Sequence, residues 1–165
     1  MNASLRDFAV ALAGAAALSC AAAPVRVETF DARTWQALQG SLTARTAVVF
    51  TTTDCAYCPG VLRQLADEIR KRRLDATLVA VVMDVAPGEV DAQLLDDPHH
   101  RGVDRLLAFS GQAPALRHSV NPAWRGVTPY IALLVPGAAP KWVTGPPSAG
   151  VLESWAAAAP RAAGR

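Results

Sequence analysis

The sequence contains few cysteines and histidines, the usual ligands of structural zinc. It has three cysteines and three histidines among 165 residues. A closed structural zinc site needs four ligands, and no second cysteine pair exists to complete one. The remaining candidates are His99, His100 and His118, of which the first two open a predicted helix, where we expect exposed side chains. The composition therefore argues against structural zinc, and we expect no metal.

The sequence also lacks an excess of charge of either sign. The 16 Lys and Arg residues against 14 Asp and Glu leave a net charge of +2. No stripe of basic residues alternates with aromatic residues, as a nucleic-acid surface would require. The longest basic cluster, Arg70–Arg73, ends a predicted helix, where cations complement the helix dipole. We expect no nucleic-acid partner.

Internal repeats and low-complexity linkers are absent after the N-terminal segment. With 165 residues, 52% of them hydrophobic, the chain can bury a core but is too short for two full domains. We expect a single domain over residues 24–160 and a frayed tail over 161–165.

The N-terminal segment has the composition of an export signal. Phe8–Ala23 is a nearly uninterrupted run of Ala, Leu and Val that ends in small residues, which predicts a signal over residues 1–23. Cleavage after Ala22 fits the small-residue rule. Alternatively, Ala17–Cys20 resembles a lipoprotein cleavage box, which would leave Cys20 lipidated as a membrane tether. An uncleaved anchor is a third option, although a spanning helix needs about 20 apolar residues. We expect a periplasmic or otherwise extracytoplasmic protein.

Two cysteines are left once Cys20 is removed or acylated. Cys55 and Cys58 are then the only thiols of the mature chain, so they can pair only with each other. A structural crosslink normally closes a longer loop, because its entropic benefit grows with loop length. The pair is therefore predicted to be a redox-active disulfide, and we expect no further cofactor.

A strand, a helix and a second strand surround the cysteine pair. Thr46–Thr53 contains a continuous β-branched and aromatic run, which indicates a buried strand, and Thr77–Met83 is a second such run. Apolar residues recur at helical spacing between them, at Val61, Leu62, Leu65 and Ile69. The order predicts a parallel pair with a right-handed crossover, and it places the cysteines at a strand-to-helix junction.

The two ends of the domain have clear patterns. Val25–Phe30 alternates as an edge strand does, and a helix over Ala32–Gln39 follows an N-cap aspartate. Tyr130–Val135 is a buried strand that returns through a turn to Lys141–Thr144. A last helix begins after Ser148 and ends at Pro160.

The stretch from residue 84 to 125 is harder to interpret, and we expect a helical insertion there. A helix is predicted over Pro98–Ser110, because Asp97 is an N-cap residue and apolar residues continue at helical spacing. Glu89–Leu95 is predicted to form a shorter helix, and Gly111–Arg125, with two prolines, to be irregular.

The predicted position of Cys55 suits a nucleophile. At the first residues of a helix, unpaired backbone N–H groups and the positive end of the dipole stabilise a thiolate. Cys58, about one turn further on, can then resolve a mixed disulfide with a substrate sulfur. Asp54 opposes the thiolate unless its carboxylate points into solvent.

Taken in order, these features resemble the thioredoxin superfamily over residues 25–159. The features are the strand Val48–Phe50, the Thr-rich approach to Asp54–Cys58, the helix after it, the dipeptide Thr128–Pro129 before a buried strand, the hairpin and the last helix. The resemblance implies a thioredoxin-like α/β fold with a central mixed sheet of about four to five strands, flanked by helices.

The resemblance also implies a substrate-binding surface. In that family the equivalent of Pro129 is cis and lies opposite the cysteines, and its neighbour, here Thr128, pairs with an extended substrate strand through its backbone. Tyr57 is an aromatic residue beside the second cysteine, and Thr128 precedes the proline. This pattern resembles exported disulfide isomerases and related bacterial thioredoxin-like proteins more than thioredoxin itself. We therefore expect substrate contacts at Tyr57, Thr128 and Pro129. Val49 stands where thioredoxin keeps a buried acid.

The leading functional hypothesis is a thiol-disulfide oxidoreductase that acts on exported protein thiols and exchanges electrons with a membrane or periplasmic redox partner. Its direction stays open, because about 30 mV of reduction potential corresponds to only about 1.4 kcal/mol. One alternative is a copper-binding assembly factor similar to Sco-type proteins, with Cys55, Cys58 and His118 as ligands. Those proteins separate their cysteines by three residues and this chain by two. A binding module with an idle disulfide is a third hypothesis.

Overall fold

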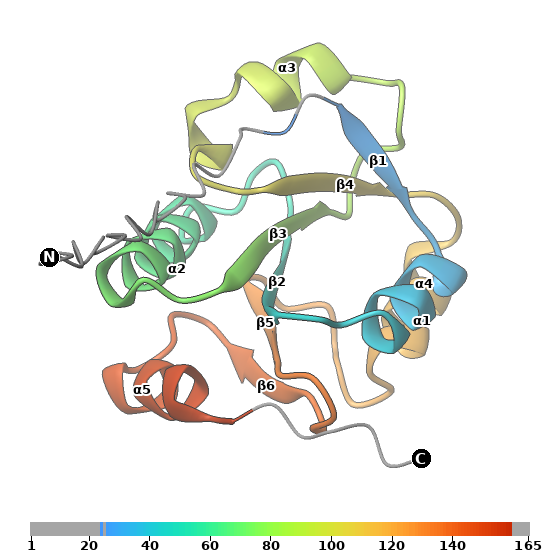
Figure 1. Ribbon diagram of the computed structural model, residues 1–165. Helices are drawn as coiled ribbons and strands as arrows, with labels where there is room; N and C mark the ends of the chain where they lie inside the picture. Colours follow the sequence, from blue (N-terminus) through green and yellow to red (C-terminus); the bar gives the residue numbers. More distant parts are fainter. Residues whose placement is uncertain (1–23, 25, 160–165) are drawn as a thin grey trace, which may run out of the picture.

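The structure is a computed structural model that describes residue 24 and residues 26–159. Its centre is a six-stranded sheet in the order β1-β4-β3-β2-β5-β6, with helices on both faces (Figure 1). The strands are β1 Val27–Phe30, β2 Arg45–Thr51, β3 Ala76–Val82, β4 Arg105–Phe109, β5 Tyr130–Leu134 and β6 Lys141–Thr144. The helices are α1 Ala32–Gly40, α2 Cys58–Arg72, α3 Asp91–Asp96, α4 Ala113–Val120 and α5 Ala149–Ala157, with a 3₁₀ turn at Pro98–His100.

The sheet has a parallel and an antiparallel part. Strands β1, β4, β3 and β2 are parallel neighbours, whereas β5 is antiparallel to β2 and β6 is antiparallel to β5. Helix α2 makes the crossover from β2 to the parallel β3, as the sequence predicts. This mixed sheet between helices confirms the predicted α/β class.

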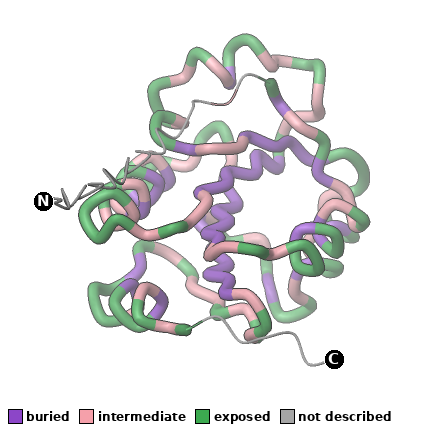
Figure 2. Tube along the Cα trace, viewed as in Figure 1, coloured by how far each residue is buried: buried purple, intermediate pink, exposed green. Residues whose placement is uncertain are grey.

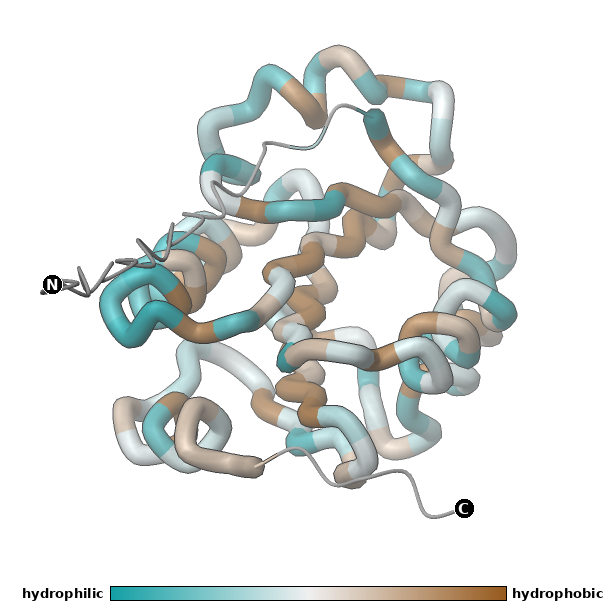
Figure 3. Tube along the Cα trace, viewed as in Figure 1, coloured by the Kyte–Doolittle hydropathy of each residue, from teal (hydrophilic) through white to brown (hydrophobic). Residues whose placement is uncertain are grey.

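Each face of the sheet has its own hydrophobic core. One core receives Leu62 and Leu65 from α2 and Trp155 from α5. The other receives Trp35 from α1 and Leu116 from α4. Figure 2 shows the central strands buried between these layers, and Figure 3 shows that hydrophobic residues follow one another along these strands. Strands covered on both faces must be apolar at successive positions, which explains the continuous runs in the sequence.

Two helix N-termini have the caps that the sequence predicts. The Asp31 carboxylate accepts a hydrogen bond of 2.7 Å from the N–H of Thr34 at the start of α1. The Ser148 hydroxyl accepts one of 3.4 Å from the N–H of Val151 in α5. The predicted hairpin of β5 and β6 and the edge position of β1 are also confirmed.

The prediction of a helix over Pro98–Ser110 is wrong. Only the first three residues form a 3₁₀ turn, Gly102 then takes a φ of +84°, and Arg105–Phe109 is the strand β4 between β1 and β3. The four apolar residues of β4 are all buried, so they formed a continuous run that fits a buried strand as well as a helix. The sheet has six strands, more than expected, because the insertion contributes β4.

The stretch Gly111–Arg125 is also more regular than predicted, since it contains the helix α4. Pro114 lies in the first turn of that helix, where a missing backbone donor costs nothing. The expected short helix at Glu89–Leu95 is present as α3. The insertion is therefore helical on both sides of an added strand.

The predicted signal over residues 1–23, including Cys20, and the tail over 161–165 lie outside the described residues. Within residues 24 and 26–159, none of the helices combines the length and the hydropathy that a membrane crossing requires.

Candidate redox site

The cysteine pair lies in the connection from β2 to α2. Cys55 and Cys58 form a disulfide with their Cα atoms 5.4 Å apart, so the predicted pairing is present. The helix begins at Cys58, so Cys55 lies in the turn before α2. The prediction that Cys55 is among the first residues of the helix is therefore wrong. The turn is closed by hydrogen bonds of 3.2 Å from the N–H of Cys55 to the carbonyl of Thr52 and from the N–H of Cys58 to the carbonyl of Cys55.

The two cysteines differ in their accessibility. Cys58 is 1% exposed, whereas Cys55 is partly exposed. Asp54 is exposed, so water screens its charge from the neighbouring sulfur. A partner approaching from solvent therefore meets Cys55 first.

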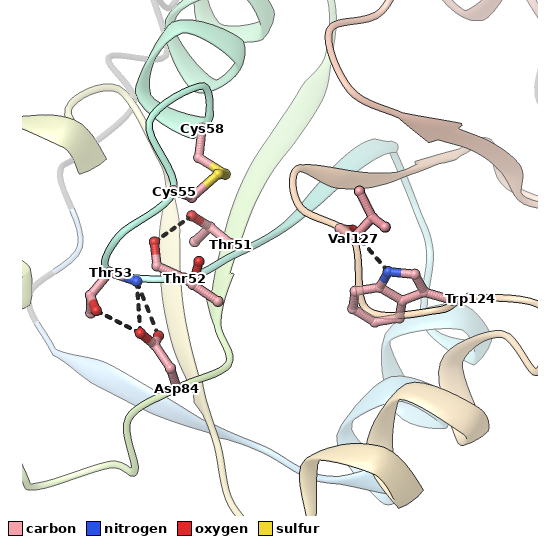
Figure 4. Close-up of a disulfide and its surroundings, with 8 residues drawn as sticks. All are labelled: Thr51, Thr52, Thr53, Cys55, Cys58, Asp84, Trp124 and Val127. Carbon is pink, nitrogen blue, oxygen red and sulfur yellow. Dashed lines mark hydrogen bonds between the residues drawn. A yellow bond between two sulfur atoms is a disulfide. The ribbon is translucent and has the colours of Figure 1, made fainter.

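The register of the sheet brings the Thr128–Pro129 segment to the same end of the sheet. Phe50 of β2 lies opposite Tyr130 of β5, so the chain leaving β2 toward Cys55 runs beside the chain that enters β5. The peptide bond between Thr128 and Pro129 is cis, the form that the resemblance implies. Pro129 is buried and Thr128 is partly exposed. In Figure 4 the sulfur atoms project toward the side on which Val127 lies.

The fold is thioredoxin-like. A disulfide follows the central strand and precedes a helix, and a cis-proline opens the adjacent antiparallel strand. An antiparallel hairpin and a last helix complete the order of elements predicted from the sequence.

No protein-family model matches the sequence, and no curated relative matches it. Among solved structures, a secreted Mycobacterium tuberculosis disulfide oxidoreductase homologous to Escherichia coli DsbE has 16% identity and a TM-score of 0.47, over 73% of this chain and 81% of that one. StoA from Bacillus subtilis has 19% identity and a TM-score of 0.46, over 68% of this chain and 81% of its own. At such identities and scores, the similarity says nothing about the activity or substrate of this chain.

Trp124 anchors the segment before the cis-proline. Its indole N–H donates a hydrogen bond of 3.0 Å to the carbonyl of Val127, and its ring is buried against Phe50 and Tyr130. Burial raises the pKa of Tyr130, while the hydrogen bond with the Asn121 amide acts in the opposite direction. The phenol beside the site therefore stays neutral at physiological pH.

Two large apolar side chains are mostly exposed in the part of the chain that the structure describes, and both belong to this region. Tyr57, between the cysteines, is 73% exposed, and Val127, directly before Thr128, is 57% exposed. Single exposed apolar residues are ordinary, but these two lie on the two segments that border the disulfide. Tyr57 could be predicted from its place between the cysteines, whereas Val127 could not, because a lone valine in a loop carries no sequence signal.

Asp84, two residues after β3 ends, contacts the turn that carries Cys55. Its carboxylate accepts hydrogen bonds of 3.1 and 3.0 Å from the N–H of Thr53 and one of 2.5 Å from the Thr53 hydroxyl (Figure 4). This role of Asp84 was not predicted, since Asp84 and Thr53 lie 31 positions apart in the sequence.

His118 is exposed on α4. Within residues 24 and 26–159, no three or more His, Cys, Asp or Glu side chains form a group that could hold a metal ion. The structure therefore does not bring His118 together with the two cysteines.

Proposed function

We propose that this protein is a thiol-disulfide oxidoreductase that acts on exported protein thiols, with Cys55 as the attacking group and Cys58 as the resolving group. The observation that carries the proposal is the disulfide of a partly exposed and a buried cysteine, located where the register of β2 and β5 brings the cis-proline segment beside it. A structural crosslink over two intervening residues would add little stability, because the loop that it closes is so short.

In the reducing direction, the Cys55 thiolate attacks one sulfur of a substrate disulfide. A mixed disulfide forms, and the other substrate sulfur leaves as a thiolate that takes up a proton. The Cys58 thiolate then attacks the Cys55 sulfur, expels the second substrate thiol and restores the Cys55–Cys58 disulfide. Two electrons pass from the protein dithiol to the substrate. The same steps in reverse oxidise a substrate dithiol, and a membrane or periplasmic redox partner resets the pair.

The substrate would bind as an extended segment along Thr128 and Pro129. Thr128 is partly exposed, so its backbone groups are the ones offered to such a segment. The Val127 carbonyl already accepts a hydrogen bond from the Trp124 indole N–H, which holds the segment next to Thr128. Tyr57 and Val127 would contact apolar side chains next to the substrate cysteine.

The proposed location is extracytoplasmic. The sequence of residues 1–23 supports export, with cleavage or with lipidation of Cys20 as a tether, and disulfides persist in oxidising compartments.

A turnover assay with the mature chain tests the activity. Reduction of insulin and refolding of scrambled ribonuclease should proceed with the wild type and stop with Cys55→Ser. The matched variant His118→Ala should keep wild-type activity, because His118 lies on α4 and takes no part in the exchange. Equal activity of Cys55→Ser and the wild type would remove Cys55 as the nucleophile.

A further inference from the structure

Asp84 connects the end of β3 to the turn that carries Cys55. The preceding residue, Met83, donates its N–H to the carbonyl of Thr51 at 3.0 Å, which fixes Asp84 beside the end of β2. The carboxylate of Asp84 accepts hydrogen bonds from both donors of Thr53, the backbone N–H and the hydroxyl. One side chain thus holds a residue that lies two positions before Cys55.

The contacts of this turn matter most when the disulfide is open. Reduction removes the covalent link. Besides the disulfide, the turn has hydrogen bonds of 3.2 Å from the N–H of Cys55 to the carbonyl of Thr52 and from the N–H of Cys58 to the carbonyl of Cys55, together with the contacts of Asp84 with Thr53. The first two lie within the turn itself. The carboxylate of Asp84 is attached to a different element, so it can hold the turn in place relative to the sheet.

We propose that Asp84 is a positioning residue that keeps Cys55 within reach of Cys58 in the dithiol form. The inference rests on the proposed redox role of the pair. A turn that is already held in place loses less conformational freedom when the disulfide closes. The contact of Asp84 with Thr53 therefore raises the effective concentration of the Cys55 thiol near the Cys58 thiol. By linkage, closing the disulfide strengthens that contact by the same factor.

The charge of Asp84 is a second property that a substitution changes, because a carboxylate close to a thiolate disfavours it. Salt separates the two contributions, since it screens the charge between exposed groups and leaves hydrogen bonds in place. Substitution separates them too. Asp84→Asn removes the charge but keeps one acceptor oxygen, whereas Asp84→Ala removes both.

The test is the equilibrium of the protein dithiol with oxidised glutathione, which yields the protein disulfide and two molecules of glutathione. Asp84→Ala should lower the equilibrium constant for disulfide formation about threefold, a potential about 14 mV less negative, since a tenfold change corresponds to about 29.6 mV. Asp84→Asn and Thr53→Val should give smaller shifts, and the Asp84→Ala shift should persist at high salt. Asp75→Ala, a change at the exposed carboxylate just before β3, should have no effect.

An unchanged potential in Asp84→Ala would overturn the proposal, because a merely structural role lowers the stability of both redox forms equally. Equal shifts in the Ala and Asn variants that vanish at high salt would also overturn it and assign the effect to charge. Asp84→Asn and Thr53→Val keep the test decisive if Asp84→Ala does not fold. The equilibrium needs no protein substrate, so its outcome is independent of the turnover assay.

Discussion

The indole of Trp124 stacks on the phenol of Tyr130, with the ring centroids 4.5 Å apart and the planes inclined by 11°. The same indole donates its N–H to the carbonyl of Val127. One side chain thus joins the aromatic core to the segment before the cis-proline. The shape of the proposed substrate surface therefore depends on Trp124, although Trp124 forms no hydrogen bond with either cysteine.

Replacing Trp124 with phenylalanine should separate packing from positioning. The ring keeps much of its stacking, while the hydrogen bond to Val127, worth about 1 kcal/mol, is lost. We expect a higher KM for a protein disulfide and a nearly unchanged reduction potential. Trp124→Ala should also lower the free energy of unfolding, by about 3–5 kcal/mol, because the indole is buried. Steady-state kinetics and urea unfolding measure the two effects, and an unchanged KM in Trp124→Phe would contradict the positioning role.

The exposed side chains of Tyr57 and Val127 should matter for large substrates only. Truncating either one to alanine removes apolar surface from the proposed contact, so KM for a reduced or oxidised protein should rise severalfold. Turnover of a small disulfide such as oxidised glutathione should stay at the wild-type rate, because it offers no neighbouring apolar side chain. Equal losses with both substrates would place these residues in the exchange step instead of in recognition.

The stability of the protein at low pH should depend on Glu28. The hydrogen bond from Arg105 is the largest cause that holds the pKa of Glu28 below its ordinary 4.5, with the charge of Arg105 acting in the same direction. A lowered pKa in the folded state means that the ion pair stabilises the fold above about pH 4.5 and that this contribution is lost as the pH falls through the lowered pKa. Both side chains are partly exposed, so we expect about 1 kcal/mol or less.

Urea unfolding of Glu28→Gln measures this contribution. The variant should lose stability relative to the wild type near pH 7, and the difference should shrink as the pH falls below 4.5 and through the lowered pKa of Glu28. Glu153→Gln, at an exposed position of α5, is the matched control and should follow the wild type. A constant difference between Glu28→Gln and the wild type from pH 7 to 3 would contradict the assignment.

Much of the fold could be predicted from local sequence patterns. The runs of β2 and β3 are buried on both faces, and the caps Asp31 and Ser148 act within a few residues of their own helices. Such patterns involve residues close in the sequence, so they can be recognised without knowledge of the tertiary structure. Strand β4 was predicted as a helix because its short apolar run fits both the helical and the strand pattern. Its position between β1 and β3 in the sheet makes it a strand, and the sequence does not show that position.

The site was predictable only in part, for the same reason. The spacing of the cysteines and the Thr128–Pro129 dipeptide are visible in the sequence. The contact of Asp84 with Thr53 and the exposure of Val127 arise where β2, β3 and β5 come together. Nothing in the residue types alone distinguishes Asp84 from other surface carboxylates. The sequence also does not show at which residue α2 begins, and this decides whether Cys55 lies in the helix or before it.

The central claim is that the accessible Cys55 attacks and the buried Cys58 resolves. Trapping tests it most directly: reduced Cys58→Ser and Cys55→Ser proteins are each mixed with a protein disulfide, and the products are identified by mass spectrometry. The account predicts a stable mixed disulfide through Cys55 in the Cys58→Ser variant and far less adduct in Cys55→Ser, because Cys58 is 1% exposed. Adduct formation through Cys58 at an equal or greater rate would contradict it.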